Sequence, residues 1–352
     1  MVVSNCSYIF TCIINILLLL IKVATGANKS CPIMNGNHQS VEDKIDAFSA
    51  IFSTYKYDNK LIKYFVMTPS SKPYYKNPTG VSFDWSKSEC VGKSVFFNCQ
   101  PWLGDGNATW IYALLSTYVE EFGGCAVSSD YPGAVKTYRY LTAARETNNI
   151  AQGLSSYIMD NICKVTDCSE RLQLHGVSLG AHVCGVTGYL LKQRGVIVPR
   201  MIASDAAGPV YHLYDENNGT LHLSKESAAF VMNLKTSCFY GSSLTSWVHQ
   251  TQIIGDACGC QQNQCPAKDE SCSHSYSVVL MRTTMKKKFK NIKIRKCSKC
   301  ACINTSYVYP SVIENLGYKA KGMHGIFKKE GKLNVCVDLS IPFEGGNKRK
   351  HL

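Results

Sequence analysis

The sequence contains no internal repeats and no long low-complexity linker, which excludes a repeat array and a string of domains on flexible tethers. Acidic residues are scarce near its end: residues 281–352 hold 17 Lys and Arg against 4 Asp and Glu, whereas the remainder holds 21 of each. The whole net charge of +13 therefore lies in the last fifth of the chain. Such a segment suits an anionic lipid surface or forms a solvated basic face. Nucleic-acid binding is not expected, because no nucleic-acid-binding motif accompanies the charge.

The amino-terminal segment predicts a secretory leader. Residues 8–23 are almost wholly apolar and small residues follow, with cleavage expected after Gly26 or Ala27, although no Lys or Arg precedes the apolar run. A membrane anchor is the alternative, but the run is short for a span. We expect a signal peptide over residues 1–26 and one mature domain over residues 27–352, since a hydrophobic content of 45% can build a large core.

The mature part of the chain is rich in cysteine. Of the 18 cysteines, 16 lie outside the predicted leader, and an even, high count behind a leader indicates disulfides formed in an extracellular, oxidising compartment. The Cys-x-Cys pairs at 258–260 and 300–302 match zinc spacing poorly, so no metal is expected. Four asparagines stand in glycosylation sequons, which suit a secreted protein: Asn28, Asn107, Asn218 and Asn304.

Strand-like and helix-like segments alternate through the middle of the chain. Residues 28–90 are expected to form strands and loops at a sheet edge. Further strands are expected near 94–97, 125–134, 172–177, 198–205 and 228–237, and helices near 110–122, 135–163 and 179–191. This alternation predicts an α/β fold, in which helices cover both faces of a mostly parallel sheet.

Ser178 stands between Gly176 and Gly180, where the strand-like run gives way to the helix-like one. Such a turn pushes the hydroxyl out of the sheet, and only glycines leave room for the backbone to fold so tightly beside it. The alternative is a small residue at a crowded turn. The context favours Ser178 as a nucleophile, which needs a base to take its proton and an anion to orient that base.

Asp205 and His274 are the expected partners of this serine. Reactive groups gather beyond the carboxyl ends of parallel strands, and Asp205 ends the strand that follows Ser178. If the chain order is Ser, Asp, His, the histidine comes later, and His274 lies between a cysteine and an apolar, helix-like run. By contrast, His182 lies four residues beyond Ser178 on the helix and should point into packing.

An acyl-transfer site also needs N–H donors for the oxyanion. Leu179, directly after the serine, is the first candidate. The second is expected in the loop after the strand at 94–97, where Gln100 can donate and Pro101, which has no N–H, cannot. This chemistry requires no metal and no organic cofactor.

Taken together, these segments resemble the pancreatic lipase family, and within it most closely the short secreted phospholipase A1 enzymes of insect venoms. HGVSLGAHVCG resembles the family's serine segment, SDAAGPVY its aspartate segment, CSHS its histidine segment and CACINTSYVYP the phospholipase tail. The resemblance covers roughly residues 90–340. It implies an α/β-hydrolase fold with Ser178, Asp205 and His274 as the catalytic triad.

Loop lengths carry what the resemblance implies about the substrate. In this family a lid lies between two cysteines ahead of the histidine; here the candidate pair is Cys265 and Cys272, and the polar residues PAKDES between them cannot present an amphipathic lid helix. The loop at residues 209–228 is also brief, and too few residues remain for a carboxyl-terminal β-sandwich domain. In this family short loops are associated with phospholipase A1 activity, so the resemblance implies hydrolysis of the sn-1 acyl ester of glycerophospholipids. We also expect a monomer that associates peripherally with a membrane surface.

Three positions depart from the family pattern. Asn98-Cys99 replaces a His-Gly pair directly before Gln100, Asp205-Ala206-Ala207 replaces Asp-Pro-Ala, and Lys235 stands where a histidine is common. Two alternatives therefore stay open. One is a triacylglycerol lipase or carboxylesterase on the same triad, and the other is a catalytically weak lipid-binding or storage relative.

Overall fold

The computed structural model describes most of the chain between residues 57 and 286, together with the backbone of one later strand. The described residues are 57–70, 83–106, 108–136, 140–211, 219, 221–241, 247–254, 260–262, 264–267, 269–286 and 333–337. The predicted leader, the four sequon asparagines and most of the basic segment lie outside these residues.

The described strands form one sheet in the order β1-β3-β2-β4-β5-β6-β7-β8. Only β1 runs antiparallel to its neighbour β3, and every other pairing is parallel. The strand bounds are β1 Lys63–Met67, β2 Val95–Cys99, β3 Cys125–Asp130, β4 Leu172–Val177, β5 Arg200–Ser204, β6 Phe230–Lys235, β7 Gln250–Ile254 and β8 Leu333–Val337. The predicted α/β class is confirmed, with the antiparallel strand at one edge.

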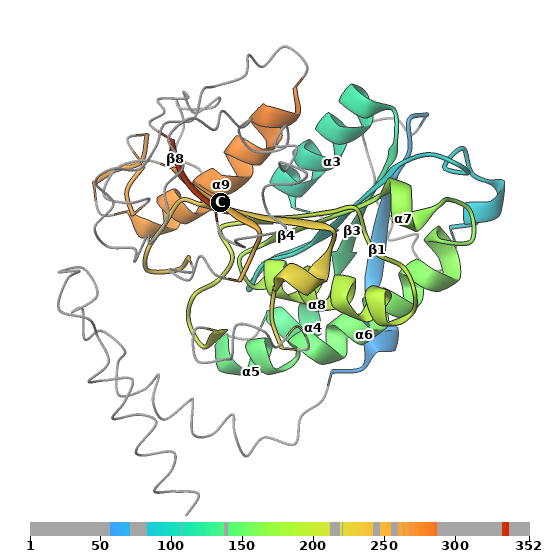
Figure 1. Cartoon of the computed structure of the whole chain (residues 1–352), viewed down its shortest axis with the longest axis horizontal. Coiled ribbons are helices and arrows are strands. Elements are labelled where there is room, and N and C mark those ends of the chain that lie inside the picture. The colour runs from blue at the N-terminus through green and yellow to red at the C-terminus, as the bar shows by residue number, and fades with distance from the viewer. Residues whose placement is uncertain are drawn as a thin grey trace, which may run out of the picture.

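Helices cover both faces of this sheet, with α3 and α9 on one side and α4, α5, α6 and α8 on the other (Figure 1). The helix bounds are α3 Thr109–Phe122, α4 Pro132–Val135, α5 Tyr140–Arg145, α6 Thr147–Tyr157, α7 Cys168–Arg171, α8 Leu179–Gln193 and α9 Glu270–Met285, with a π-helical turn at Ile158–Ile162 and 3-10 turns at Asn59–Leu61, Trp85–Lys87 and Lys225–Ser227. Parallel strands need such crossovers, and the helices bury the apolar residues that point out of each face.

The long helix predicted over residues 135–163 is wrong in one respect, because the structure divides it. Helix α5 stops before Glu146, whose carboxylate accepts the N–H of Tyr57 at 3.0 Å and the side-chain amide of Asn149 at 2.9 Å. This buried carboxylate therefore accepts from a backbone N–H almost ninety residues earlier in the chain. The helical periodicity of the sequence continues through the break, and the residue at the break makes a long-range contact that no local pattern reveals.

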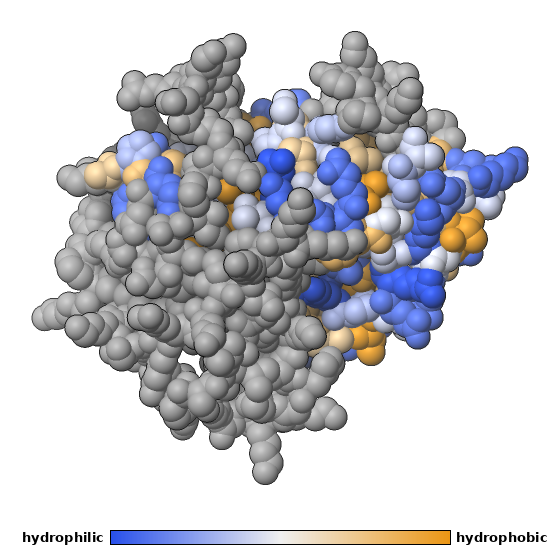
Figure 2. Space-filling view, turned by 90° about the horizontal axis from the view of Figure 1, so that it is seen from above, coloured by the Kyte–Doolittle hydropathy of each residue, from blue (hydrophilic) through white to orange (hydrophobic). Residues whose placement is uncertain are grey.

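The core has two parts, one on each face of the sheet. Val95, Phe97 and Leu174 belong to the cluster beneath α6 and α8, whereas Phe96 and Met232 belong to the cluster beneath α3 and α9. The alternation along β2 follows from the two-residue period of a strand. On the described surface seen from above, hydrophilic residues predominate and apolar residues are scattered between them (Figure 2).

Five disulfides join described cysteines, as the cysteine content predicts. They are Cys90–Cys125, Cys99–Cys184, Cys163–Cys168, Cys238–Cys260 and Cys265–Cys272. Cys260, one member of a Cys-x-Cys pair, is thus oxidised and offers no thiolate to a metal. Within the described part of the chain, no helix is both long and apolar enough to cross a membrane.

Candidate active site

Ser178 lies at the turn between β4 and α8, as the sequence predicts. Its φ of 54° and ψ of −120° are unusual for a residue with a side chain. A Cβ at Gly176 would come within 2.2 Å of the Gly180 carbonyl oxygen, and a Cβ at Gly180 would come within 2.3 Å of the carbonyl oxygens of Cys99 and Gln100. Both glycines are therefore required by close backbone approach around the serine.

Asp205 lies beside Ser178 because their strands are neighbours. In the parallel pair β4–β5, Val177 is opposite Ser204, so the chain leaves the sheet at the same level on both strands. The Ser178 N–H donates to the Ser204 carbonyl at 3.1 Å, and the Ala207 N–H donates to the Ser178 carbonyl at 3.2 Å. Asp205 itself is fully buried, with a φ of 49°.

The carboxylate of Asp205 is held by three donors. Its Oδ1 accepts the Thr236 N–H at 3.0 Å, and its Oδ2 accepts the Ser237 hydroxyl at 2.5 Å and contacts His274 Nδ1 at 2.7 Å. The loop passes so close that a Cβ at Gly241 would lie 2.3 Å from Oδ1. A buried carboxylate with partners on both oxygens has one orientation, which points one lone pair at the imidazole.

His274 is the fifth residue of α9, and its side chain keeps 16% of its surface accessible. Because a carboxylate only accepts, Nδ1 carries the hydrogen and Nε2 of the neutral ring is left as an acceptor. The ring of Tyr240 lies 5.5 Å from the ring of His274, centre to centre. The structure thus joins His274 to Asp205 by a hydrogen bond, and Ser178 follows the neighbouring strand β4. Among the described residues, Ser178 Oγ has no hydrogen-bond partner.

The expected oxyanion donors are the N–H groups of Gln100 and Leu179. Gln100 follows β2, is fully buried, and its carbonyl accepts the Tyr131 hydroxyl at 2.9 Å. Leu179 is the first residue of α8, where N–H groups have no partner within the helix. Within the described chain, neither the Gln100 N–H nor the Leu179 N–H meets an acceptor. Two backbone donors are thus unpaired near Ser178.

The family's His-Gly pair is replaced by residues with new partners. The Oδ1 of Asn98 accepts from His175 Nδ1 at 2.7 Å, and His175 Nε2 lies 2.9 Å from the Ser204 hydroxyl, so a polar row crosses three strands. Burial lowers the pKa of His175 to about 3, so the ring is neutral at ordinary pH. Cys99 forms a disulfide with Cys184. Sequence reasoning missed both contacts, because the register between β2 and β4 brings Asn98 to His175 and the packing of α8 on the sheet brings Cys184 to Cys99.

Lys235, the third departure, is also buried. Its ammonium group donates to the Ser237 carbonyl at 2.5 Å. Since the hydroxyl of Ser237 donates to Asp205, this lysine fixes the loop that holds the aspartate. Ser237 was not singled out from the sequence, although its place at the end of the strand predicted near 228–237 was a signal; the observed strand β6 ends two residues earlier, at Lys235. His182 packs as expected, with Nε2 2.8 Å from the Ala207 carbonyl.

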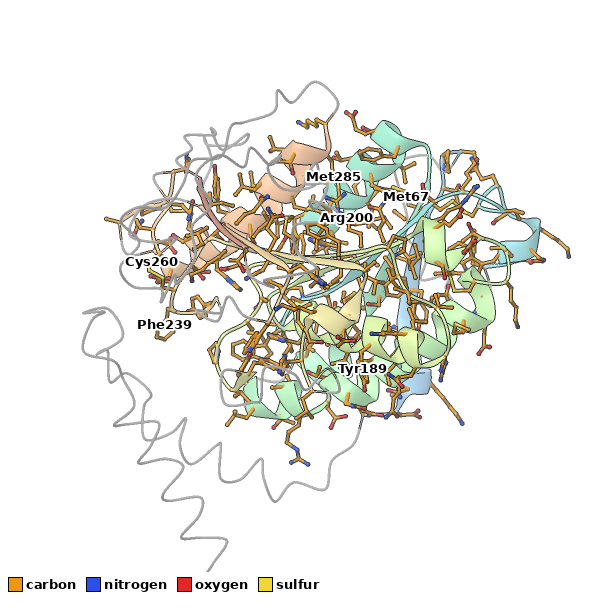
Figure 3. All side chains as sticks on the ribbon, viewed as in Figure 1. Met67, Tyr189, Arg200, Phe239, Cys260 and Met285 are labelled. Carbon is orange, nitrogen blue, oxygen red and sulfur yellow. A yellow bond between two sulfur atoms is a disulfide. The ribbon has the colours of Figure 1, made fainter. Side chains whose placement is uncertain are left out.

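The segment ahead of His274 is tied down by two disulfides. Cys265 and Cys272 are joined, and the carboxylate of Asp269 between them accepts the Cys272 N–H at 2.8 Å as the cap of α9. Cys260 is joined to Cys238, next to Phe239, and Figure 3 shows Phe239 and Cys260 near each other at the opposite end of α9 from Met285. The Cys265–Cys272 disulfide therefore links the short predicted lid covalently to α9, the helix that carries His274.

The sheet and the strand–turn–helix around Ser178 define the fold class as that of the α/β-hydrolases. The family model described as Lipase matches residues 34–249, and the chain belongs to this family.

Curated relatives include two phospholipases A1. The one from Solenopsis invicta is 29% identical over 168 residues, 47% of this chain and 46% of its own length, so the chain spans less than half of that relative. The one from Vespula vulgaris is 24% identical over 85% of this chain and 84% of its own. Among solved structures, a dienelactone hydrolase from Anabaena variabilis is similar over 49% of this chain and 66% of its own, with 8% identity and a TM-score of 0.30.

Proposed function

We propose that the protein is a secreted serine esterase of the phospholipase A1 type, which hydrolyses the sn-1 acyl ester of glycerophospholipids. The observation that carries this proposal is the 2.7 Å contact between buried Asp205 and His274, at the strand edge where Ser178 leaves the sheet. A buried carboxylate behind an imidazole serves to orient and charge-balance a base.

The proposed reaction uses these three residues in sequence. Ser178 Oγ attacks the ester carbonyl carbon while His274 Nε2 takes its proton, and Asp205 stabilises the imidazolium. The carbon–oxygen bond to glycerol then breaks, and the leaving oxygen takes the proton from His274. Water attacks the acyl-enzyme with His274 as base again, which releases the fatty acid and restores the Ser178 hydroxyl.

The negative charge that develops on the carbonyl oxygen needs the two unpaired amides. The N–H groups of Leu179 and Gln100 are the proposed donors, since neither has another acceptor among the described residues. Losing one such donor typically costs about 3–4 kcal/mol in the barrier. The chemistry as a whole is carried by side chains and backbone groups, and the proposal includes no cofactor.

The phospholipid substrate is supported by two features. The segment between the joined Cys265 and Cys272 is too short for an amphipathic lid, and the two curated relatives named above are phospholipases A1. Secretion is supported by the five disulfides among the described residues and by the apolar leader in the sequence. Amino-terminal sequencing of the secreted protein should begin after Gly26 or Ala27.

Attraction of a monomer to anionic membranes is the proposed role of the basic segment. Exposed charges are screened beyond about 8 Å at physiological salt, so vesicle binding should weaken as salt rises. Binding that does not change with salt would contradict this role.

The decisive experiment uses phosphatidylcholine with different acyl chains at its two positions. The wild-type protein should release the sn-1 chain, and Ser178→Ala should release none above background. Triacylglycerol emulsion in the same assay separates a phospholipase from a general lipase. Equal release by the two proteins would remove Ser178 from the mechanism.

A lipid-binding or storage function is the second candidate, and the absence of a hydrogen bond to Ser178 Oγ in the described chain favours it. A fluorophosphonate probe distinguishes the two, because it reacts only with an activated serine. Labelling that is lost in Ser178→Ala supports the esterase, whereas lipid binding without any labelling supports the second candidate.

A further inference from the structure

The disulfide Cys99–Cys184 joins the two segments that carry the proposed oxyanion donors. Cys99 is the last residue of β2 and directly precedes Gln100, while Cys184 lies in α8, five residues after Leu179. Both cysteines are fully buried, and their Cα atoms are 5.8 Å apart. The covalent bond therefore links the end of the strand before Gln100 to the helix that begins with Leu179.

The same two segments are in direct backbone contact. A Cβ added to Gly180 would lie 2.3 Å from the carbonyl oxygens of both Cys99 and Gln100. The helix start and the strand end thus approach as closely as two backbones can. Because Gly180 has no side chain, it makes no side-chain contact that could hold the end of β2 in place.

Few described hydrogen bonds involve the backbone of Gln100 itself. Its N–H makes no sheet bond among the described residues, and Pro101 has no N–H to offer, so the hydrogen-bonded ladder ends at Cys99. The chain then turns away through Leu103, whose φ is 57°. Apart from the disulfide, the described contact that fixes this amide most directly is the 2.9 Å hydrogen bond from Tyr131 to the Gln100 carbonyl.

We propose that Cys99 and Cys184 are a positioning pair for the oxyanion hole: their disulfide holds the Gln100 N–H in register with the Leu179 N–H. The proposal rests on the proposed function. It explains how a chain with a cysteine in place of the family's glycine can keep this loop in place. Because both sulfur atoms are buried, the pair acts as a fixed staple and is not a redox switch.

The test compares three proteins in the mixed-chain phosphatidylcholine assay: wild type, C99A/C184A, and C163A/C168A as the matched control. The control removes a disulfide that precedes the amino end of β4, whereas Ser178 lies beyond its carboxyl end. For each protein, kcat and KM are measured separately, together with the rate of fluorophosphonate labelling and the melting temperature.

We expect C99A/C184A to lose about 10- to 100-fold in kcat and in labelling rate, because small displacements of a catalytic donor cost about this much. Its KM should stay within about threefold, since the lost contact acts on the transition state. C163A/C168A should keep kcat within about twofold, even if its melting temperature falls. If C99A/C184A does not fold, C99V/C184A restores side-chain volume and carries the same expectation.

Two results would overturn the proposal. One is a kcat within twofold of wild type in C99A/C184A or C99V/C184A. The other is an equal loss of kcat in C163A/C168A, which would show a general effect of lost stability. These results leave the wild type active, so they remove only the positioning role. A wild type without esterase activity would instead refute the proposed function, and this inference with it.

Discussion

The two sides of Ser178 are held in place by different means. On one side, Asp205 and His274 are oriented by hydrogen bonds from Thr236 and Ser237. On the other side, the Gln100 and Leu179 backbones are oriented by close packing at Gly180 and by a buried disulfide.

The difference follows from the groups being positioned. A carboxylate can be held by donors because spare lone pairs remain for its imidazole partner. A backbone N–H that must stay unpaired for a substrate cannot be held by a hydrogen bond of its own. It has to be positioned through the atoms next to it, by packing and covalent bonds.

The largest expected effect on activity comes from a substitution on the side of Ser178 that is held by hydrogen bonds. Asp205→Asn should lower kcat by about 10⁴-fold, because an amide facing Nδ1 favours the wrong tautomer of His274. Asp160→Asn, in the π-helical turn, is the control and should leave kcat unchanged. Fatty-acid release by the two variants is the measurement. Near-normal activity of Asp205→Asn would place the acid–base function elsewhere.

A smaller effect is expected from the packed side. Gly180→Ala forces its Cβ against the carbonyl oxygens of Cys99 and Gln100 and should lower kcat by about 10²- to 10³-fold, as for loss of one oxyanion donor. Gly195→Ala is the control: its Cβ meets open space, and its φ of 84° costs about 1–2 kcal/mol of stability without touching the site. Equal kcat in both variants would contradict the packing role.

Ser237→Ala tests how much one hydrogen bond to Asp205 contributes to activity. It removes one of the donors to Asp205 but keeps the Thr236 N–H, so we expect kcat to fall about tenfold, near the effect of one hydrogen bond to a charged group. Ser155→Ala, buried in α6, is a matched control for loss of a hydroxyl. A loss as large as that of Asp205→Asn would show that Ser237 is indispensable to the pair.

The smallest expected effect is on the pH dependence of the free energy of unfolding. Burial lowers the pKa of His175 and of His182 to about 3, against an ordinary value of 6.5. Below pH 6.5 the unfolded chain therefore binds more protons than the folded one at these two histidines. Their contribution to the free energy of unfolding is fully present above pH 6.5 and is lost as the pH falls toward 3. Two such groups give a change of about 2.4 kcal/mol in the free energy of unfolding between pH 6 and 5.

Urea unfolding of wild type and His175→Gln across this range measures the slope. The slope of the variant should be smaller by the contribution of one buried histidine, while His182 and His249, whose pKa burial also lowers, still contribute. An unchanged slope would mean that His175 is not the buried neutral ring of the polar row.

Much of the fold was predictable because its signals are local. The strand near 172–177 and the helix after Ser178 follow from hydrophobic period and glycine placement, and β4 and α8 confirm them. β7, Gln250–Ile254, was not predicted, because its polar residues are buried in the sheet and break the expected alternation. The division at Glu146 was not predicted either, since the helical periodicity runs through it.

By itself the sequence determined the α/β class, the strand–turn–helix around Ser178 and the choice of Asp205 and His274 as its expected partners. These depend on period, turn chemistry and chain order, which the sequence states directly. Two contacts could be read only from the packed molecule: Asn98 faces His175, and Cys99 bonds to Cys184. The first depends on the register between the neighbouring strands β2 and β4, and the second on how α8 packs against the end of β2; neither follows from a local sequence pattern.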